Sequence, residues 1–306
     1  MAVLGGLAGL LGLAGLGGLA ALLGLRGPGP RARVAEGTVR TVEAYGDGPL
    51  QRGEWWLPAP GGRGAGEGLL PTVVLVHGGY WRPGYDRSLE DAVAADLAGR
   101  GFLVWNIDYA AADSPWPATL LDVAAAHDAL RTGAYADRVD PARTAVVGHS
   151  AGGHLALWLA SRTRLPPGAP GAGPRAPVPA LAVGQAPVAA LVQGAGEGLG
   201  RGAVVALLGG TPDQVPERYA VTDPAALAPS GVPTVLLHSA ADDLVPISQS
   251  EAYVRAAARA APGVRVVRPA PAGPPARLVR VPGDHFAHLD PRSPAVAELR
   301  RALQVL

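Results

Sequence analysis

The chain contains no cysteine, and all 26 of its basic residues are arginine. The lack of cysteine excludes disulfides, thiolate catalysis and cysteine-ligated metal sites. Because 25 acidic residues nearly balance the arginines, no excess of positive charge indicates binding to nucleic acid or to an acidic membrane surface. Only 17% of the 306 residues are charged and 48% are hydrophobic, so the chain is neither disordered nor a charged coiled coil.

The first 36 residues differ from the rest in composition. Residues 2–25 carry no charge and hold ten Leu and eight Gly, a length close to the roughly 20 apolar residues of a membrane-spanning helix. Basic residues follow this segment rather than precede it, and no A-x-A-like cleavage site ends it. Three interpretations fit: a membrane anchor, an uncleaved signal sequence, and a misassigned start. The positive-inside tendency predicts a cytoplasmic location for the rest of the chain, with a tether to the membrane if the segment is an anchor.

The remainder, 37–306, is predicted to be one catalytic domain of α/β class. Strand-like and helix-like segments alternate, which is typical of a mostly parallel sheet flanked by helices. Two stretches are expected to be irregular: 187–231, interpreted as a lid or pocket wall, and the proline-rich 262–275. The predicted strands are 38–45, 54–57, 72–76, 102–107, 144–147, 180–183, 234–238 and 277–281, and the predicted helices are 89–98, 118–131, 153–161, 248–261 and 294–303.

A serine lies in the pattern Gly148-x-Ser150-x-Gly152, directly between a predicted buried strand and a predicted helix. In that context the pattern predicts a strained turn that exposes the serine hydroxyl above the sheet. A serine hydroxyl is a poor nucleophile at neutral pH, so a base and an orienting carboxylate are needed downstream. The alternative is an ordinary glycine-rich turn that contains a serine.

The predicted base is His285, just past the last predicted strand, with His288 as its nearest rival. The predicted carboxylate is Asp242, which follows the strand 234–238, and Asp243 remains the alternative. Either one could accept the Nδ1 proton of the histidine and fix its tautomer.

Donors for a developing oxyanion are expected after the strand 72–76. The glycines of His77-Gly78-Gly79-Tyr80-Trp81-Arg82 let the backbone approach closely there. We expect the amides of Gly79, Tyr80 and Ala151 to surround one oxygen.

With these motifs in place, roughly residues 40–305 resemble the α/β-hydrolase superfamily, and specifically its esterase and arylformamidase-like branch. The order Ser150, Asp242, His285 is the order of that superfamily. Kynurenine formamidases of the branch carry HGGYW, as do many carboxylesterases. Two features depart from the branch: Asp108-Tyr109-Ala110 replaces a common Glu-Tyr-Arg, and the stretch before Arg277 is longer. The matching segments are 77–82, 106–109, 148–154, 242–246 and 283–291.

The resemblance implies a serine hydrolase that needs no cofactor and cleaves a small-molecule ester or amide. A carboxylesterase is the first expectation, an arylformamidase the second, and an inactive binding or scaffold protein the alternative of another class. Trp81, Arg82 and His149 are the expected substrate-binding residues. No metal site is predicted, because the HGG and GHS motifs account for the clustered histidines and no HExxH pattern occurs.

Overall fold

The computed structural model describes residues 38–64, 66–260 and 275–306. Its centre is a sheet of eight strands in the order β1-β2-β4-β3-β5-β6-β7-β8. Neighbouring strands from β4 to β8 are parallel, and β2 runs antiparallel to β1 and β4. The strands are β1 Val39–Ala44, β2 Arg52–Leu57, β3 Leu70–Val76, β4 Leu103–Ile107, β5 Val139–His149, β6 Leu181–Gln185, β7 Thr234–His238 and β8 Ala276–Arg280.

The central strands are rich in valine and leucine and are buried, as expected for parallel strands that are covered on both faces. Their pairing brings the carboxyl ends of β3, β5, β6 and β7 to one edge of the sheet. Val76 pairs with Gly148, and His149 pairs with Gln185. The segments that follow these strands therefore meet at the same edge, where open α/β sheets bind their ligands.

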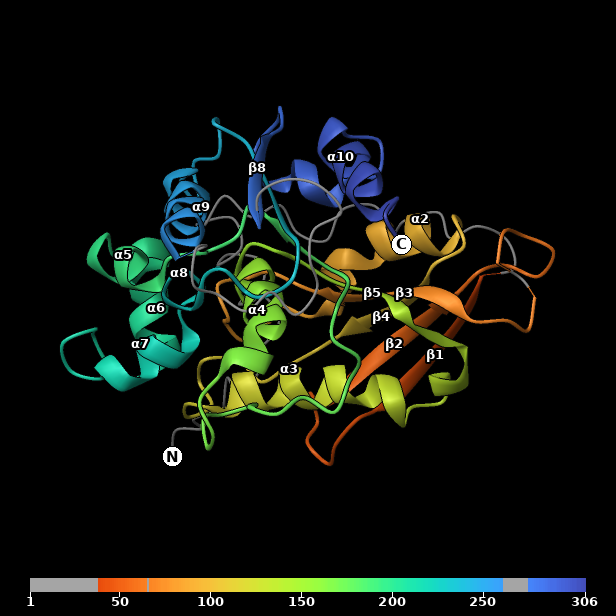
Figure 1. Ribbon diagram of the computed structural model, residues 1–306, viewed down its shortest axis with the longest axis horizontal. Helices are drawn as coiled ribbons and strands as arrows, with labels where there is room; N and C mark the ends of the chain where they lie inside the picture. Colours follow the sequence, from red (N-terminus) through yellow and green to blue (C-terminus); the bar gives the residue numbers. More distant parts are fainter. Residues whose placement is uncertain (1–37, 65, 261–274) are drawn as a thin grey trace, which may run out of the picture. The chain divides into compact units, whose positions relative to one another are not determined.

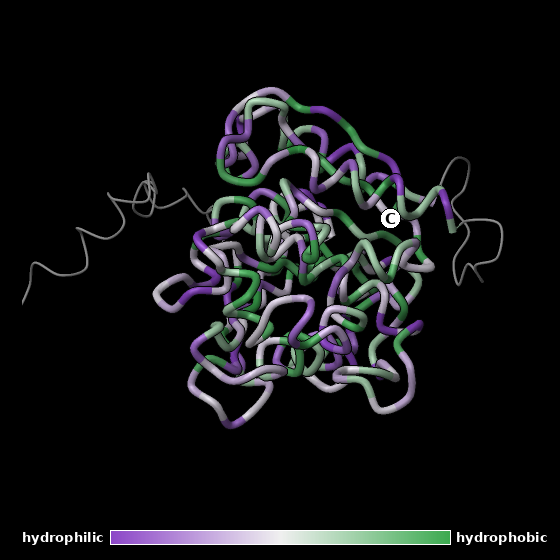
Figure 2. Tube along the Cα trace, turned by 90° about the vertical axis from the view of Figure 1, so that its left-hand side faces the viewer, coloured by the Kyte–Doolittle hydropathy of each residue, from purple (hydrophilic) through white to green (hydrophobic). Residues whose placement is uncertain are grey.

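Helices cover both faces of the sheet (Figure 1). One face packs its apolar side chains against α2 and α10, and the other packs against α3, α4, α6 and α9. Figure 2 shows hydrophobic segments through the interior and hydrophilic ones on the outer loops. The α-helices are α2 Asp91–Ala98, α3 Ala118–Asp128, α4 Ala151–Ser161, α5 Leu191–Gly196, α6 Leu199–Leu208, α7 Pro216–Thr222, α8 Pro224–Leu227, α9 Ser248–Ala260 and α10 Pro294–Leu303, and the short 3-10 helices are η1 Arg87–Glu90, η2 Ala129–Arg131, η3 Ala136–Arg138, η4 Arg162–Arg164 and η6 His285–Leu289.

The alternating order of strands and helices predicted from the sequence is confirmed. The expectation that 187–231 is irregular is wrong, because this stretch forms α5 to α8. The strand expected at 144–147 is longer and spans β5. The proline-rich loop lies almost entirely, and the N-terminal segment entirely, outside the described residues. None of the helices among the described residues combines the length and the apolar composition of a membrane span.

Candidate active site

Ser150 stands at a tight turn between β5 and α4. Its backbone angles are φ 57° and ψ −119°, outside the regions that L residues ordinarily adopt. The Ser150 amide donates to the carbonyl of Gln185 (2.8 Å), and the Ser150 carbonyl accepts from the amide of Val188 (3.2 Å). A Cβ added to Gly152 would lie 2.0 Å from the carbonyl oxygen of Val76, so only glycine fits there. The sequence predicted this strained turn, and neighbouring backbone groups hold it in place.

The loop after β8 brings His285 to this turn. Nδ1 of His285 lies 2.7 Å from Oδ2 of Asp242, whose carboxylate is 0% exposed. His149, the chain neighbour of Ser150, donates from Nε2 to the carbonyl of His285 at 2.9 Å. Asp243 is exposed, so of the two adjacent aspartates it is Asp242 that reaches the histidine.

Four donors surround the Asp242 carboxylate. Oδ1 accepts from the amides of Leu244 (3.0 Å) and Val245 (2.8 Å), and Oδ2 lies within reach of His285 and, at 3.5 Å, of Nε2 of His238. Burial would raise the pKa of Asp242, but the hydrogen bonds from His238 and His285 outweigh it and hold the pKa well below its ordinary value. The carboxylate is therefore ionised at neutral pH. An ionised Asp242 keeps a proton on Nδ1 of His285 and leaves Nε2 free to accept one.

The loop after β3 approaches the serine closely. A Cβ added to Gly78 would lie 3.0 Å from Cβ of Ser150. Gly79, Tyr80 and Trp81 have φ values of 113°, 52° and 55°, a run of left-handed residues that marks a strained, tightly turned loop. Among the described residues, no protein acceptor takes the amide protons of Gly79, Tyr80 or Ala151. Ala151 also begins α4, where the helix dipole favours negative charge.

Two tyrosine rings fix the position of this loop, and no motif in the sequence indicates a role for either ring. Tyr109 donates from its hydroxyl to the carbonyl of His77 (2.7 Å) and stacks on the His77 ring at 4.3 Å. Tyr80 donates from its hydroxyl to the carbonyl of Leu244 (2.6 Å), two residues after Asp242. The loop with the free amides is thereby joined to the loop with the carboxylate.

Two of the three residues expected to bind substrate have buried side chains. Trp81 is 1% exposed, belongs to the hydrophobic core and packs edge-on against His154. His149 is buried beneath His285, and burial together with the nearby His285 and His288 rings holds the pKa of His149 well below its ordinary value. A substrate contact for either side chain stays a prediction.

Arg82, the third of these residues, is half-buried and faces α6. Its guanidinium donates to the carbonyl of Gly200 and lies 5.8 Å from the centre of the Tyr80 ring. Gly200 adopts a left-handed conformation, and a Cβ added to it would lie 2.5 Å from the same ring. The start of α6 therefore packs directly beside the loop after β3, as a pocket wall would; a lid function for 187–231 stays a prediction.

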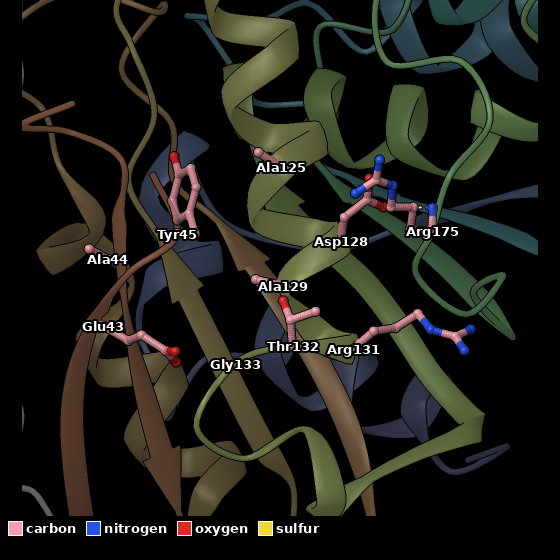
Figure 3. A pocket seen from close by; sticks show the side chains of 10 residues that line it. All are labelled: Glu43, Ala44, Tyr45, Ala125, Asp128, Ala129, Arg131, Thr132, Gly133 and Arg175. Carbon is pink, nitrogen blue, oxygen red and sulfur yellow. Dashed lines mark hydrogen bonds between the residues drawn. The ribbon is translucent and has the colours of Figure 1, made fainter. Parts of the chain in front are cut away.

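A separate hollow of about 490 Å³ lies between β1 and the end of α3 (Figure 3). Its carboxylates already have partners. Glu43 accepts from the indole of Trp55 (2.6 Å), and Asp128 forms an ion pair with Arg162 (2.9 Å). None of the residues predicted from the sequence to act in catalysis lines this hollow.

The family model named BD-FAE matches residues 63–256, well over half of the chain. The chain belongs to the BD-FAE family. The matched residues include Ser150 and Asp242, and His285 follows them.

Individual relatives of this BD-FAE protein agree with the family. The carboxylesterase NlhH of Mycobacterium tuberculosis is 35% identical over 136 residues, which are 44% of this chain and 40% of that protein. The chain thus aligns with less than half the length of this curated relative. Among solved structures, esterase B from Lactobacillus rhamnosis bound to a tributyrin phosphonate has a TM-score of 0.71 at 20% identity, covering 90% of this chain and 87% of the other. A truncated carbohydrate esterase from gut microbiota has a TM-score of 0.69 at 18% identity, covering 89% and 98%. The predicted α/β-hydrolase fold is confirmed.

We expect the buried acid Glu90 to make the stability of the BD-FAE domain depend on pH. Glu90 is 0% exposed, and neither of its carboxylate oxygens has a partner among the described residues. Burial, with the adjacent Asp91 adding to it, raises the pKa of Glu90 to about 8. A folded pKa above the unfolded one gives stability that is complete below about pH 4.5 and is lost as the pH rises through about 8.

The variant Glu90→Gln keeps the shape of the side chain and removes its titration. We expect similar free energies of unfolding near pH 5 and a variant more stable than wild type by on the order of 4 kcal/mol at pH 9, measured by urea denaturation. Glu67→Gln, on an exposed loop, is the matched control and should leave the pH dependence unchanged. Parallel stability curves for Glu90→Gln and wild type would contradict the assignment.

Proposed function

We propose that this BD-FAE protein is a carboxylesterase that cleaves small-molecule esters through an acyl-enzyme on Ser150. One observation carries the proposal: a buried, ionised Asp242 is hydrogen-bonded to His285, whose loop contacts the strained turn that holds Ser150. A carboxylate, an imidazole and a strained serine in this relation supply the orienter, base and nucleophile of acyl transfer.

In the first half of the reaction, Oγ of Ser150 attacks the ester carbonyl while Nε2 of His285 takes its proton. The imidazolium that forms is stabilised by Asp242 through Nδ1. The negative charge on the former carbonyl oxygen is stabilised by the amides of Gly79, Tyr80 and Ala151. The carbon–oxygen bond of the ester then breaks, and His285 gives its proton to the departing alcohol.

In the second half, a water molecule attacks the acyl-enzyme while His285 again accepts a proton. Collapse of the second tetrahedral intermediate breaks the bond between the acyl carbon and Oγ of Ser150. His285 returns the proton to the serine, and the carboxylic acid leaves. No group outside this chain other than water is needed to balance the reaction.

The relatives support an ester rather than a formamide as substrate. The proteins reported above are named carboxylesterase, esterase and carbohydrate esterase, and none of them is named an arylformamidase. A serine esterase mechanism agrees with two solved structures of similar proteins: esterase B inhibited by a tributyrin phosphonate, and esterase 2 of Thermogutta terrifontis phosphoramylated by tabun. Both inhibitors carry electrophilic phosphorus, which a serine nucleophile attacks.

The proposal is tested by giving the purified full-length chain a fluorophosphonate probe and, in parallel, four substrates. These are p-nitrophenyl acetate, butyrate and octanoate, and N-formylkynurenine. We expect one probe per chain by intact mass, with the label on the peptide that contains Ser150. We also expect kcat/KM for the best ester to exceed that for N-formylkynurenine by at least about tenfold, a difference of about 1.4 kcal/mol in transition-state binding.

Two other outcomes would decide for the alternatives. A higher kcat/KM for N-formylkynurenine than for every ester would make the protein an arylformamidase. A folded chain that neither binds the probe nor turns over any of the four compounds would be an inactive scaffold. The intact set of Ser150, Asp242 and His285 argues against that outcome.

A further inference from the structure

A second histidine contacts the carboxylate that holds His285. His238 is the last residue of β7, four positions before Asp242, and it is 0% exposed. Its Nε2 lies 2.8 Å from the carbonyl oxygen of Val245 and 3.5 Å from Oδ2 of Asp242. Its Nδ1 lies 2.7 Å from Oγ of Ser250 on α9. Three partners from two segments, the loop after β7 and the start of α9, therefore hold one ring beneath the site.

These partners determine which nitrogen carries the proton. A carbonyl oxygen only accepts, so Nε2 of His238 must carry a hydrogen that points toward Val245 and Asp242. In the neutral ring Nδ1 then accepts from the hydroxyl of Ser250. The N–H of His238 is thus held toward the same carboxylate oxygen, Oδ2, that accepts from His285.

We propose that His238 is a positioning residue of the active site, which fixes the orientation of the Asp242 carboxylate and shares its Oδ2 with His285. The inference rests on the proposed function, because it assigns the dyad of Asp242 and His285 to catalysis. The buried carboxylate has two amides on Oδ1 and two histidines on Oδ2. Without His238, one side of Oδ2 loses its only fixed donor among the described residues, and the carboxylate is free to rotate away from His285.

His238 also affects how strongly Asp242 stabilises the charged form of His285. Because His238 helps to hold Oδ2 beside Nδ1 of His285, its removal lets the carboxylate turn away and weakens its stabilisation of the His285 imidazolium. The other titratable groups that face His285 are His149, at 4.6 Å between ring centres, and His288. Burial, with His285 and His238 nearby, lowers the pKa of His288 to about 3, so His288 stays neutral through the working pH range.

The test compares His238→Phe, which keeps a buried ring without a donor, with His238→Gln, whose amide nitrogen can occupy the place of Nε2. For His238→Phe we expect kcat for p-nitrophenyl acetate to fall about 10- to 100-fold with KM within about twofold of wild type. We also expect the acidic limb of its kcat/KM profile to move to lower pH by about half a unit, because the displaced carboxylate stabilises the protonated imidazole less. His238→Gln should recover at least about a third of the wild-type kcat and return the acidic limb of the kcat/KM profile to its wild-type pH.

Two further measurements separate positioning from a general loss of structure. Rates are divided by the number of active sites that bind the fluorophosphonate probe. A variant that is merely unstable would have fewer active sites, but each site would show the wild-type kcat and the wild-type pH dependence. The downfield proton resonance of the hydrogen bond between His285 and Asp242 reports on the dyad without substrate. We expect it to shift in His238→Phe and to return in His238→Gln.

The inference is overturned if His238→Phe has the wild-type kcat per active site, the wild-type pH dependence of kcat/KM and the wild-type proton resonance. If His238→Phe does not fold, Ser250→Ala decides instead, because it frees only Nδ1 of the ring: an approximately threefold lower kcat supports the inference, and unchanged kinetics overturn it. A wild-type chain without probe binding or turnover would remove the proposed function, and the proton resonance would still show whether His238 orients Asp242.

Discussion

Replacing Ser150 with alanine is expected to lower kcat for p-nitrophenyl acetate by about 10⁵- to 10⁶-fold. The variant loses the atom that attacks the carbonyl, and the remaining rate comes from the amides and from water. The turn should persist, because it is held through backbone groups of Ser150 rather than through its hydroxyl. The measurements are steady-state hydrolysis and probe labelling, and both should disappear together.

The matched control is Ser161→Ala. Ser161 is the last residue of α4, is buried, and bonds from its hydroxyl to the carbonyl of Leu157 (3.0 Å). Its replacement should reduce stability by about 1 kcal/mol and leave kcat within about twofold of wild type. Hydrolysis by Ser150→Ala at a tenth of the wild-type rate or more would show that another group is the nucleophile, and the probe-labelled peptide would identify it.

The parts of the site that depend on a local turn could be predicted from the sequence. Ser150 is recognisable because the strained turn allows only small residues at fixed positions on either side of it. This requirement is visible in the sequence as glycines two residues before and two residues after the serine. Asp242 and His285 follow predicted strands at the carboxyl edge of the sheet, so strand order alone brings them together. The choice between Asp242 and Asp243 needed the structure, because adjacent residues point in different directions.

The helices of 187–231 could not be predicted because most of them are short. α5, α7 and α8 have six, seven and four residues, too few to repeat a helical period. The signals that do exist are at the helix ends: Pro216 and Pro224 occupy first-turn positions, and Asp223 accepts from the amide of Ala225 (2.9 Å). Three residues at the start of α6 adopt left-handed angles, which interrupt any regular pattern there.

The supporting roles of the His238, Tyr109 and Tyr80 rings could not be predicted from the sequence, because these rings bond to backbone carbonyls. A carbonyl is present at every position, so a contact such as that of Tyr109 with the carbonyl of His77 leaves no pattern of paired residue types. A buried histidine at the end of a strand was the one available signal for His238. Its meaning depends on Asp242, four residues later, folding back beneath it.

Replacing Asp242 with asparagine is expected to lower kcat by about 10⁴-fold while leaving the fold intact. The amide oxygen can still accept from the amides of Leu244 and Val245. The amide nitrogen then faces His285 as a donor, so His285 must present an unprotonated Nδ1 and move its proton to Nε2. A histidine protonated on Nε2 cannot take the proton of Ser150, and the missing negative charge no longer stabilises an imidazolium.

Asp243→Asn is the control for this prediction, since it makes the same chemical change one residue away on an exposed side chain. It should retain kcat within about twofold, and hydrolysis should be compared at pH 7 and pH 9 for both variants. If Asp243→Asn lost activity and Asp242→Asn kept it, Asp243 would be the orienting carboxylate and the loop would rearrange in solution. Equal, small losses in both would mean that His285 works without either carboxylate, and the hydrogen bond at 2.7 Å would then serve the fold alone.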